Sequence, residues 1–346
     1  MKVSMKRGCR LSRLFLISVF ILFLGHSAWS EETVVLYTAL DREFSEPIVL
    51  EFQRQTGIRV RCVYDTEVDK TVGLVNKLIM EKSNPRCDVF WNNEIVNTLR
   101  LKKLGLLAAC VPKNAKVIPS QFRDPQGYWT GFAARARVFL INPDKLGKTP
   151  IPRAVSELAD PALRKNATLA LPFAGTTATH FACLFVHWGQ ARTLDFVRKL
   201  HANQIPFQTG NKHVAKLVAA GYFAVGLTDT DDAIIEVRKN PRLKIVFPHA
   251  AEEGSGVLFI PNTLALLKNA PHPEAGKRLI EFLLSAFVER RLAEGPSAQI
   301  PLNPEVSRQV RLPFPVPARP MMKVSFAQAA EVFDMTIREL KKVIRQ

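Results

Sequence analysis

The sequence predicts an α/β protein of two lobes, with a hinge of two crossing strands and a ligand cleft between the lobes. Two observations carry this prediction. Patterns of short buried strands alternate with patterns of amphipathic helices, which is typical of βαβ units with a parallel sheet. The 346 residues also exceed what one hydrophobic core usually organises, even after a leader segment is removed. We therefore expect a cleft at the carboxyl ends of the strands, where ligands bind in open α/β sheets.

The first 30 residues predict a secretory signal peptide. Five basic residues and no acidic residue come before an apolar run at 14–24. A small-x-small pattern, typical of a cleavage site, follows the run and ends at Ser30. The apolar run is too short for an N-terminal membrane anchor. We expect cleavage near Ser30 and export of the mature protein to the periplasm.

The charge of the chain is strongly basic. The formal net charge of +17 falls to +12 when the five basic residues of the leader are removed. The Lys and Arg residues are scattered and no basic motif interleaved with aromatic residues is present, so we exclude a nucleic-acid partner and expect a surface that attracts anions. The spacing of the four remaining cysteines selects no disulfide pairing, and their state stays open: Cys62, Cys87, Cys110 and Cys183.

The first part of the mature chain predicts a βαβ unit. Apolar Ile48, Val49 and Phe52 predict a helix that opens at Ser45-Glu46-Pro47 and stops at Gly57. A second helix is predicted at 69–82, with Val72, Val75, Leu78 and Ile79 on one side. The predicted strands are Val34–Tyr37, Ile58–Val63 and Asp88–Trp91.

The rest of the chain predicts two crossing strands and a second α/β unit. The crossing strands are 131–142 and 257–267, and strands near Leu169 and Val225 lie between them. A polyproline-like segment at 312–320 precedes a terminal amphipathic helix at 325–344. We expect a signal peptide at 1–30, a discontinuous first lobe of 31–134 and 262–346, and a second lobe of 135–261. Further helices are predicted near 178–189, 192–202, 212–220 and 273–285.

Three carboxylates follow one predicted strand of the second lobe. The stretch GLTDTDDAI places Asp229, Asp231 and Asp232 within four residues. Like charges this close favour protonation unless donors, a cation or water compensate them, which indicates a binding site. The alternative is an Asp-rich turn that caps the next helix.

Two predicted helix starts favour an anion. Gly175, Thr176 and Thr177 open one helix, and Asn211 and Lys212 in TGNKHVA open another. Free N–H groups, hydroxyls and the helix dipole at such a start bind phosphate-like groups. An ordinary Thr-capped helix start is the alternative.

The order of these motifs resembles a known family. VVLYTALDREFSEPIVLEFQRQTGIRVRCVY, DVFWNNE and KKLGLL resemble the N-terminal lobe of periplasmic solute-binding proteins of ABC importers, in the ferric-ion-binding family. WTGFAARARVFLIN resembles the family's crossing strand, AGYFAVGLTDTDDA its second-lobe ligand loop, and APHPEAGKRLIEFLLS a late helix. The resemblance covers about residues 33–305. It implies a type 2 periplasmic-binding-protein fold, capture of a solute between the lobes and delivery to an ABC permease in the inner membrane, with no chemistry performed.

The resemblance also shows where this chain departs from the iron-binding members. They typically place two adjacent tyrosines in the second-lobe loop, where this chain has Asp231-Asp232. It has Asp41 where many iron binders place His, and Asn93, or by a one-residue shift Glu94, where they place Glu. Carboxylates are hard donors, so ferric iron held by Asp231 and Asp232 is one possible ligand, and no other metal ligand is assigned.

The resemblance implies that Arg135 on the crossing strand faces the anion. Arg135 and Arg137 alternate along that strand, so only one of them need face the cleft, and the alternative for either is a surface ion pair. We predict that a phosphate-like head group binds Thr176, Thr177 and Arg135. The opposite, hydroxyl-bearing or amino end of the ligand would bind Asp229, Asp231 and Asp232. Ferric iron with a synergistic anion on Arg135 would use both ends as well.

Two further residues complete the predicted site. Tyr37 ends the first strand and is expected to face the cleft, and His180 lies in the first turn of its helix and is expected near the ligand. His180, Cys183 and His187 share one helix face, a spacing that suits a borderline metal. The apolar residues around them favour buried packing instead.

The sequence therefore predicts a monomeric extracytoplasmic solute-binding protein that is not an enzyme and has no cofactor, with ferric iron possible as cargo. The expected ligand is ferric iron with a synergistic anion or a small phosphate- or phosphonate-bearing organic anion; the resemblance extends this to sugar phosphates and thiamine. The alternative is a metal-dependent secreted hydrolase or a sensor module that uses the same cleft. No G-x-S-x-G, P-loop, H-E-x-x-H or G-x-G-x-x-G motif supports the hydrolase.

Overall fold

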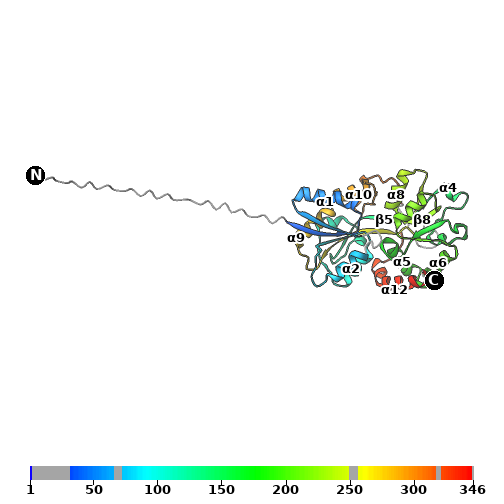
Figure 1. Cartoon of the computed structure of the whole chain (residues 1–346), viewed down its shortest axis with the longest axis horizontal. Helices are drawn as coiled ribbons and strands as arrows, with labels where there is room; N and C mark the ends of the chain where they lie inside the picture. Colours follow the sequence, from blue (N-terminus) through cyan, green and yellow to red (C-terminus); the bar gives the residue numbers. More distant parts are fainter. Residues whose placement is uncertain (2–31, 66–71, 249–255, 317–320, 345–346) are drawn as a thin grey trace. The chain divides into compact units, whose positions relative to one another are not determined.

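The computed structural model describes residue 1 and residues 32–65, 72–248, 256–316 and 321–344 (Figure 1). The predicted signal peptide and cleavage site lie outside these residues, as does the end of the polyproline-like segment. In the part of the chain that is described, no helix is both long and apolar enough to cross a membrane.

Ten described strands form one mixed sheet. Their order along the sheet is β2-β1-β3-β10-β5-β8-β6-β7, with β4 paired to β10 and β9 paired to β5. The strands are β1 (Thr33–Thr38), β2 (Arg59–Tyr64), β3 (Val89–Asn92), β4 (Leu107–Ala108), β5 (Thr130–Ile141), β6 (Ala167–Ala170), β7 (Phe207–Gln208), β8 (Val225–Asp229), β9 (Lys244–Val246) and β10 (Phe259–Leu267).

Helices connect the strands. The helices are α1 (Arg42–Thr56), α2 (Val72–Met80), α3 (Val96–Lys103), α4 (Pro143–Leu146), α5 (Gly175–His187), α6 (Gln190–Ala202), α7 (Asn211–Ala219), α8 (Thr230–Lys239), α9 (Pro273–Leu283), α10 (Ala286–Glu294), α11 (Pro304–Gln309) and α12 (Phe326–Ile344). Short 3₁₀ helices are η1 (Lys113–Val117), η2 (Ser120–Phe122), η3 (Val155–Ala159) and η4 (Pro161–Leu163).

The first half of the sheet is the predicted βαβ unit. β1 pairs in parallel with both β2 and β3, which confirms the parallel arrangement. Helices bury both faces of β3: Val89 and Trp91 pack with α1 and α9, whereas Phe90 packs with α2 and α3. A strand buried on both faces has no polar side to present, and this explains its continuous apolar sequence. The helix α1 ends as predicted, because Gly57 adopts a left-handed conformation with φ of 73°.

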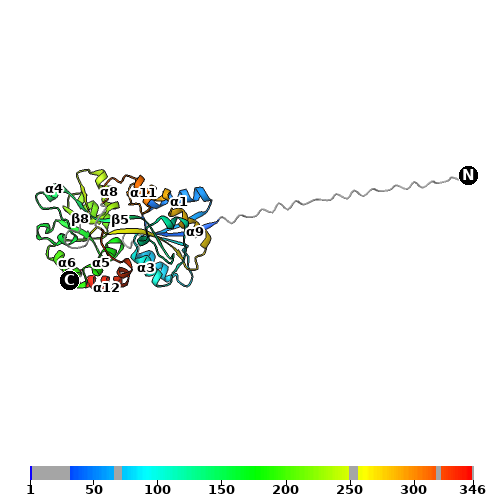
Figure 2. The ribbon, with the colours of Figure 1, turned by 180° about the vertical axis from the view of Figure 1, so that it is seen from behind.

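The long strands β5 and β10 cross the middle of the sheet as an antiparallel pair. Figures 1 and 2 show that α1 and α9 lie on one side of β5, and that α4 and α8 lie on its other side. The pairing shifts register between Ile260 and Asn262, and Ala133 opposite this irregularity has a φ of 40°. The buried carboxylate of Glu289 accepts the N–H of Ala133 at 2.7 Å. The hydrogen bond from Ala133 to Glu289 therefore stabilises this irregularity, which lies in the strands where the sequence predicted the hinge.

The second half of the sheet is a second α/β unit, as predicted. β8 and β7 pair in parallel with β6, and β5 pairs antiparallel with β8. Leu169 and Leu227 pack with α5 and α6, whereas Val138 packs with α7 and α8. The carboxyl ends of β6, β7 and β8 therefore lie at one edge of the sheet.

Some details differ from the sequence prediction. The helix α1 begins at Arg42, so Pro47 lies inside the helix rather than at its start, where it removes the N–H that would bond the carbonyl of Glu43. On α2, Leu74 is buried and Ile79 is exposed. The two-residue strands β4 and β7 and the short β9 carry too little pattern to be predicted.

The terminal helix α12 packs against α3 of the first half and against α5 and α6 of the second. Figures 1 and 2 both show α12 beside α5. It therefore bridges the two halves, although its residues were expected in the first lobe. The predicted lobe boundaries themselves remain a prediction.

Candidate functional site

A cavity of about 230 Å³ opens at the carboxyl ends of strands from both halves of the sheet. Its polar walls come from the loops and helix starts after β1, β3, β6, β7 and β8, and from β5 itself. This is the position where parallel α/β sheets bind ligands. The lining residues are Leu40, Asp41, Phe44, Asn93, Arg135, Ala170, Leu171, Phe173, Ala174, Gly175, Thr176, Thr177, Thr209, Gly210, Asn211, Lys212, Asp229, Asp231 and Asp232.

One side of the cavity, which we call the anion side, is formed by the first turns of α5 and α7. The N-cap residues Ala174 and Gly210 are extended, and neither helix has a capping side chain or an acidic residue in its first turn. The first N–H groups of a helix have no intrahelical acceptor, and both helix dipoles are positive here. Two such starts on one cavity favour an anion.

The hydroxyls of the anion side have acceptors within the protein. Thr176 donates to Asp229, and Thr177 donates to Asn211 at 3.0 Å. A hydroxyl has one proton to donate. In this arrangement the donors for an anion are the backbone N–H groups that the sequence predicted, without the hydroxyls of Thr176 and Thr177 that it predicted beside them.

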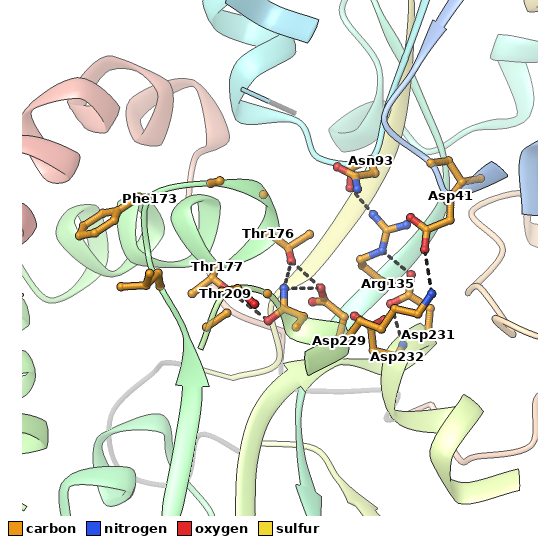
Figure 3. A pocket seen from close by; sticks show the side chains of 18 of the residues that line it. Asp41, Asn93, Arg135, Phe173, Thr176, Thr177, Thr209, Asp229, Asp231 and Asp232 are labelled. Atoms are coloured by element: carbon orange, nitrogen blue, oxygen red, sulfur yellow. Dashed lines mark hydrogen bonds and ion pairs between the residues drawn. The ribbon is translucent and has the colours of Figure 1, made fainter. Parts of the chain in front are cut away.

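Asp229 lies on the anion side rather than opposite it, which corrects the sequence prediction. Its carboxylate accepts from Arg137 Nη1 at 2.8 Å and from Asn211 Nδ2 at 3.0 Å. It also accepts from the hydroxyl of Thr176 (Figure 3). Asp229 precedes α8 directly but makes no side-chain cap bond to it. The capping alternative for Asp229 is therefore wrong, because the buried Arg137 beneath the cavity binds the carboxylate instead.

Arg135 lines the cavity, and its three guanidinium nitrogens donate to protein acceptors. Nε donates to Asp231 Oδ2 at 2.9 Å, Nη1 to the carbonyl of Asn93, and Nη2 to Asn262 Oδ1 at 3.3 Å. Burial alone would lower the pKa of Arg135, but the charges of Asp231 and Asp229 outweigh it and raise the pKa. Arg135 therefore remains charged but is directed to a carboxylate, whereas the sequence analysis directed it to the anion. The reason is that the first turn of α8 places the carboxylate of Asp231 in direct contact with the guanidinium of Arg135.

The opposite side of the cavity, the acid side, carries Asp41, Asp231 and Asp232. Asp231 and Asp232 lie in the first turn of α8, and one oxygen from each of them and from Asp229 lies within 4.8 Å of the others. Figure 3 shows Asp41 facing this cluster from the first half of the protein. Lys212 Nζ approaches Asp41 Oδ2 at 3.6 Å. The acid side is therefore built from both halves of the protein.

Asn93, and not Glu94, belongs to the cavity. Glu94 is fully buried, where its carboxylate accepts the N–H groups of Val96 and Asn97 and the hydroxyl of Thr179. It stabilises the start of α3 and links it to α5. The structure thus resolves the one-residue ambiguity of the sequence in favour of Asn93.

Tyr37 does not line the cavity, contrary to expectation. Its side chain packs under α2, and its hydroxyl donates to Glu81 Oε2 at 3.0 Å. Burial and this hydrogen bond raise the pKa of Tyr37, which keeps the phenol neutral. Tyr37 points this way because side chains alternate along a strand, and its face of β1 is the one covered by α2. None of the described tyrosines is among the residues that line the cavity.

His180 lies beneath the cavity and does not line it. Its ring is buried, and its Nδ1 accepts from Arg137 Nε at 3.4 Å. Burial, and then the charge of Arg137, lower the pKa of His180 well below its usual value, so the ring is neutral. Cys183 on the same face is fully buried, and within the described ranges the only potential metal cluster is that of the three aspartates. The four cysteines of the described chain are free thiols.

Of the twelve predicted site residues, the structure brings ten together around this cavity. They are Asp41, Asn93, Arg135, Gly175, Thr176, Thr177, Asn211, Asp229, Asp231 and Asp232. The sequence placed Lys212 beside Asn211 in the second helix start without assigning it to the site, and it missed the apolar lining residues Leu40, Phe44 and Phe173. The apolar residues carry no signal that separates cavity walls from core.

Comparison with known proteins gives a consistent result. Residues 95–319 match the family described as bacterial extracellular solute-binding protein. The chain is 28% identical to the Salmonella typhimurium protein named "Putative 2-aminoethylphosphonate-binding periplasmic protein", over 82% of this chain and 83% of that protein. It is also 28% identical to the Fe(3+)-binding periplasmic protein of Serratia marcescens, over 61% of this chain and 60% of that one.

The fold is also found among solved structures. The periplasmic binding protein AfuA from Actinobacillus pleuropneumoniae, with exogenous fructose-6-phosphate bound, superposes with a TM-score of 0.79. The match covers 91% of this chain and 99% of AfuA at 22% sequence identity. The chain therefore has the type 2 periplasmic-binding-protein fold, as the sequence predicted.

Proposed function

Because the chain belongs to the family of bacterial extracellular solute-binding proteins, we propose that it captures a small zwitterionic solute, an aminoalkyl phosphonate or a close analogue. The phosphonate would bind the N–H groups at the starts of α5 and α7. The ammonium group would bind Asp41, Asp231 and Asp232. The observation that carries this proposal is the pairing, in one cavity, of two uncapped helix starts with a cluster of carboxylates.

The electrostatics of the cavity support a ligand with both charges. Asp229 on the anion side is balanced by Arg137 at 2.8 Å, so it does not cancel the positive helix ends. The acid side retains three carboxylates around Arg135 and Lys212. A ligand that carries only negative charge would bring no cation to the carboxylates of the acid side. The relative of Salmonella named for 2-aminoethylphosphonate supports the same ligand class.

Family membership supports the remaining parts of the proposal. We propose that the protein is exported by cleavage near Ser30, acts as a monomer in the periplasm and delivers its ligand to an ABC permease. It performs no chemistry on the ligand and holds no resident cofactor. His180 is buried and neutral beside Arg137 and does not line the cavity, so it is not positioned there as the general base of a hydrolase.

Calorimetry with three matched probes tests the proposal. 2-Aminoethylphosphonate carries both charges, ethylphosphonate lacks the ammonium, and 2-aminoethanol lacks the phosphonate. We expect 2-aminoethylphosphonate to bind about tenfold to a hundredfold more tightly than either, because each charged hydrogen-bonding group contributes about 1.5–3 kcal/mol. Native mass spectrometry of the protein as purified should show a co-purified phosphonate. Equal affinity for ethylphosphonate and 2-aminoethylphosphonate would contradict the assignment of the acid side.

Ferric iron with a synergistic anion is a second candidate ligand. Oxygens of Asp229, Asp231 and Asp232 lie within 4.8 Å of one another, and hard cations bind carboxylate oxygens. The Serratia marcescens relative named for Fe(3+) supports this candidate. Among the described residues that line the cavity there is no tyrosine to supply a phenolate ligand.

A titration with iron separates the two candidates. We expect ferric iron to bind weakly, without the intense charge-transfer colour of phenolate ligands, because the Tyr37 hydroxyl is bonded to Glu81 and its raised pKa opposes ionisation. The measurement is visible absorbance during addition of ferric iron in the presence of citrate. A strongly coloured complex that resists citrate would show that tyrosines rearrange into the cavity and would favour iron as the cargo.

A further inference from the structure

Lys212 joins the two halves of the protein across the cavity. It lies in the first turn of α7, in the second half, and its Nζ contacts Glu43 Oε1 at 3.1 Å and Asp41 Oδ2 at 3.6 Å, both from the start of α1. The Lys212 side chain is 34% exposed, and it is one of the residues that line the cavity. Its ammonium group therefore lies at the edge of the acid side.

The stability of α7 does not explain a lysine at this position. A positive charge in the first turn of a helix opposes the helix dipole, and α7 has no acidic residue in that turn to offset it. Burial alone would lower the pKa of Lys212, but the hydrogen bond to Glu43 and the charges of Asp41, Glu43 and Asp232 raise it. The side chain is therefore an ammonium ion whose interacting carboxylates include two that line the cavity.

The cationic groups near the acid side differ in how firmly they are held. Arg135 is buried and bonded through each of its three nitrogens, so it cannot withdraw. Lys212 has a flexible stem and a partner, Glu43, that lies outside the cavity lining. Its ammonium already donates to Glu43 at 3.1 Å while it lies 3.6 Å from Asp41, so a cation of the ligand can replace it at Asp41 and Asp232 without leaving it unpaired.

We infer that Lys212 determines the selectivity of the cavity between zwitterionic and purely anionic ligands, an inference that rests on the proposed function. Its ammonium competes with the ammonium of a zwitterion for the same carboxylates, and it attracts a ligand that is only an anion. Removing the charge at this position should strengthen the binding of the first class and weaken the binding of the second.

The test compares the affinities of 2-aminoethylphosphonate and ethylphosphonate by calorimetry. The variants are Lys212→Gln, Lys212→Arg, which keeps the charge, and Lys216→Gln, which removes an exposed charge one turn later on α7. In Lys212→Gln we expect the preference for 2-aminoethylphosphonate, expressed as a ratio of dissociation constants, to rise about tenfold, since partly exposed ion pairs have modest effects in each direction. Lys212→Arg and Lys216→Gln should keep the ratio of the unmodified protein.

The outcomes are distinct. A ratio in Lys212→Gln that falls, or that stays within about threefold of the unmodified protein, overturns the inference. So does an equal rise in Lys216→Gln, which would reflect only the total charge of the protein. Thermal melting checks that each variant is folded. If the unmodified protein binds neither phosphonate, the proposed function itself fails; if it binds them but the ratio does not respond to Lys212, only the inference about Lys212 fails.

Discussion

Replacing Arg137 with methionine should lower the free energy of unfolding by about 3–5 kcal/mol, because it leaves the carboxylate of Asp229 buried without its cation. Arg137 is 1% exposed and Asp229 is 3% exposed. Arg137 Nη1 also donates to Asn211 Oδ1 at 3.0 Å, so the substitution disturbs the residues that position the starts of α5 and α7. The measurement is chemical denaturation of the ligand-free protein.

A double substitution provides the control for this prediction. Arg137→Met combined with Asp229→Leu removes both charges, and replacing a buried ion pair by apolar groups is often neutral. We expect the double variant to recover most of the stability lost in Arg137→Met. If the two single substitutions cost less than about 1 kcal/mol each and add in the double variant, Arg137 and Asp229 are not a coupled buried pair.

Replacing Asp232 with asparagine should weaken the binding of 2-aminoethylphosphonate about tenfold to a hundredfold, because the ammonium loses a charged partner on the acid side. Asp232 lies in the first turn of α8 and lines the cavity. Folding should be retained, because asparagine is polar and nearly isosteric, and the residue is not fully buried. Calorimetry of the variant, with thermal melting as a check, measures both quantities.

Two controls make this result specific. Asp195→Asn removes an exposed carboxylate on α6, a helix that contributes no residue to the cavity lining, and should leave the affinity unchanged. Ethylphosphonate has no ammonium, so its affinity for Asp232→Asn should not fall. If Asp232→Asn melts at a lower temperature but binds 2-aminoethylphosphonate as tightly as the unmodified protein, Asp232 serves only the helix start, as in the capping alternative.

The order of strands and helices could be predicted from the sequence because each depends on neighbouring residues. Alternation of apolar runs and amphipathic segments predicted β1, β3, β8 and the helices between them, and Gly57 predicted the end of α1. The same local reasoning predicted that polar groups gather where strands end, since the carboxyl ends of parallel strands share one edge. Most of the candidate site was therefore predictable as a set of residues.

The sequence by itself thus determined the class of fold and the residues at the edge of the sheet, and it predicted export. Only the tertiary structure decided how those residues pair: Arg135 with Asp231, Arg137 with Asp229, Lys212 with Asp41 and Glu43. Each pair joins segments more than 90 positions apart in the sequence. The alternation of side chains along β5 predicts that Arg135 and Arg137 point to opposite faces, but it does not predict which carboxylate each of them binds. The partner of a charged side chain depends on which segment packs within a few ångströms of it. That distance is set by the packing of the whole sheet and its helices, and not by any local pattern of residues.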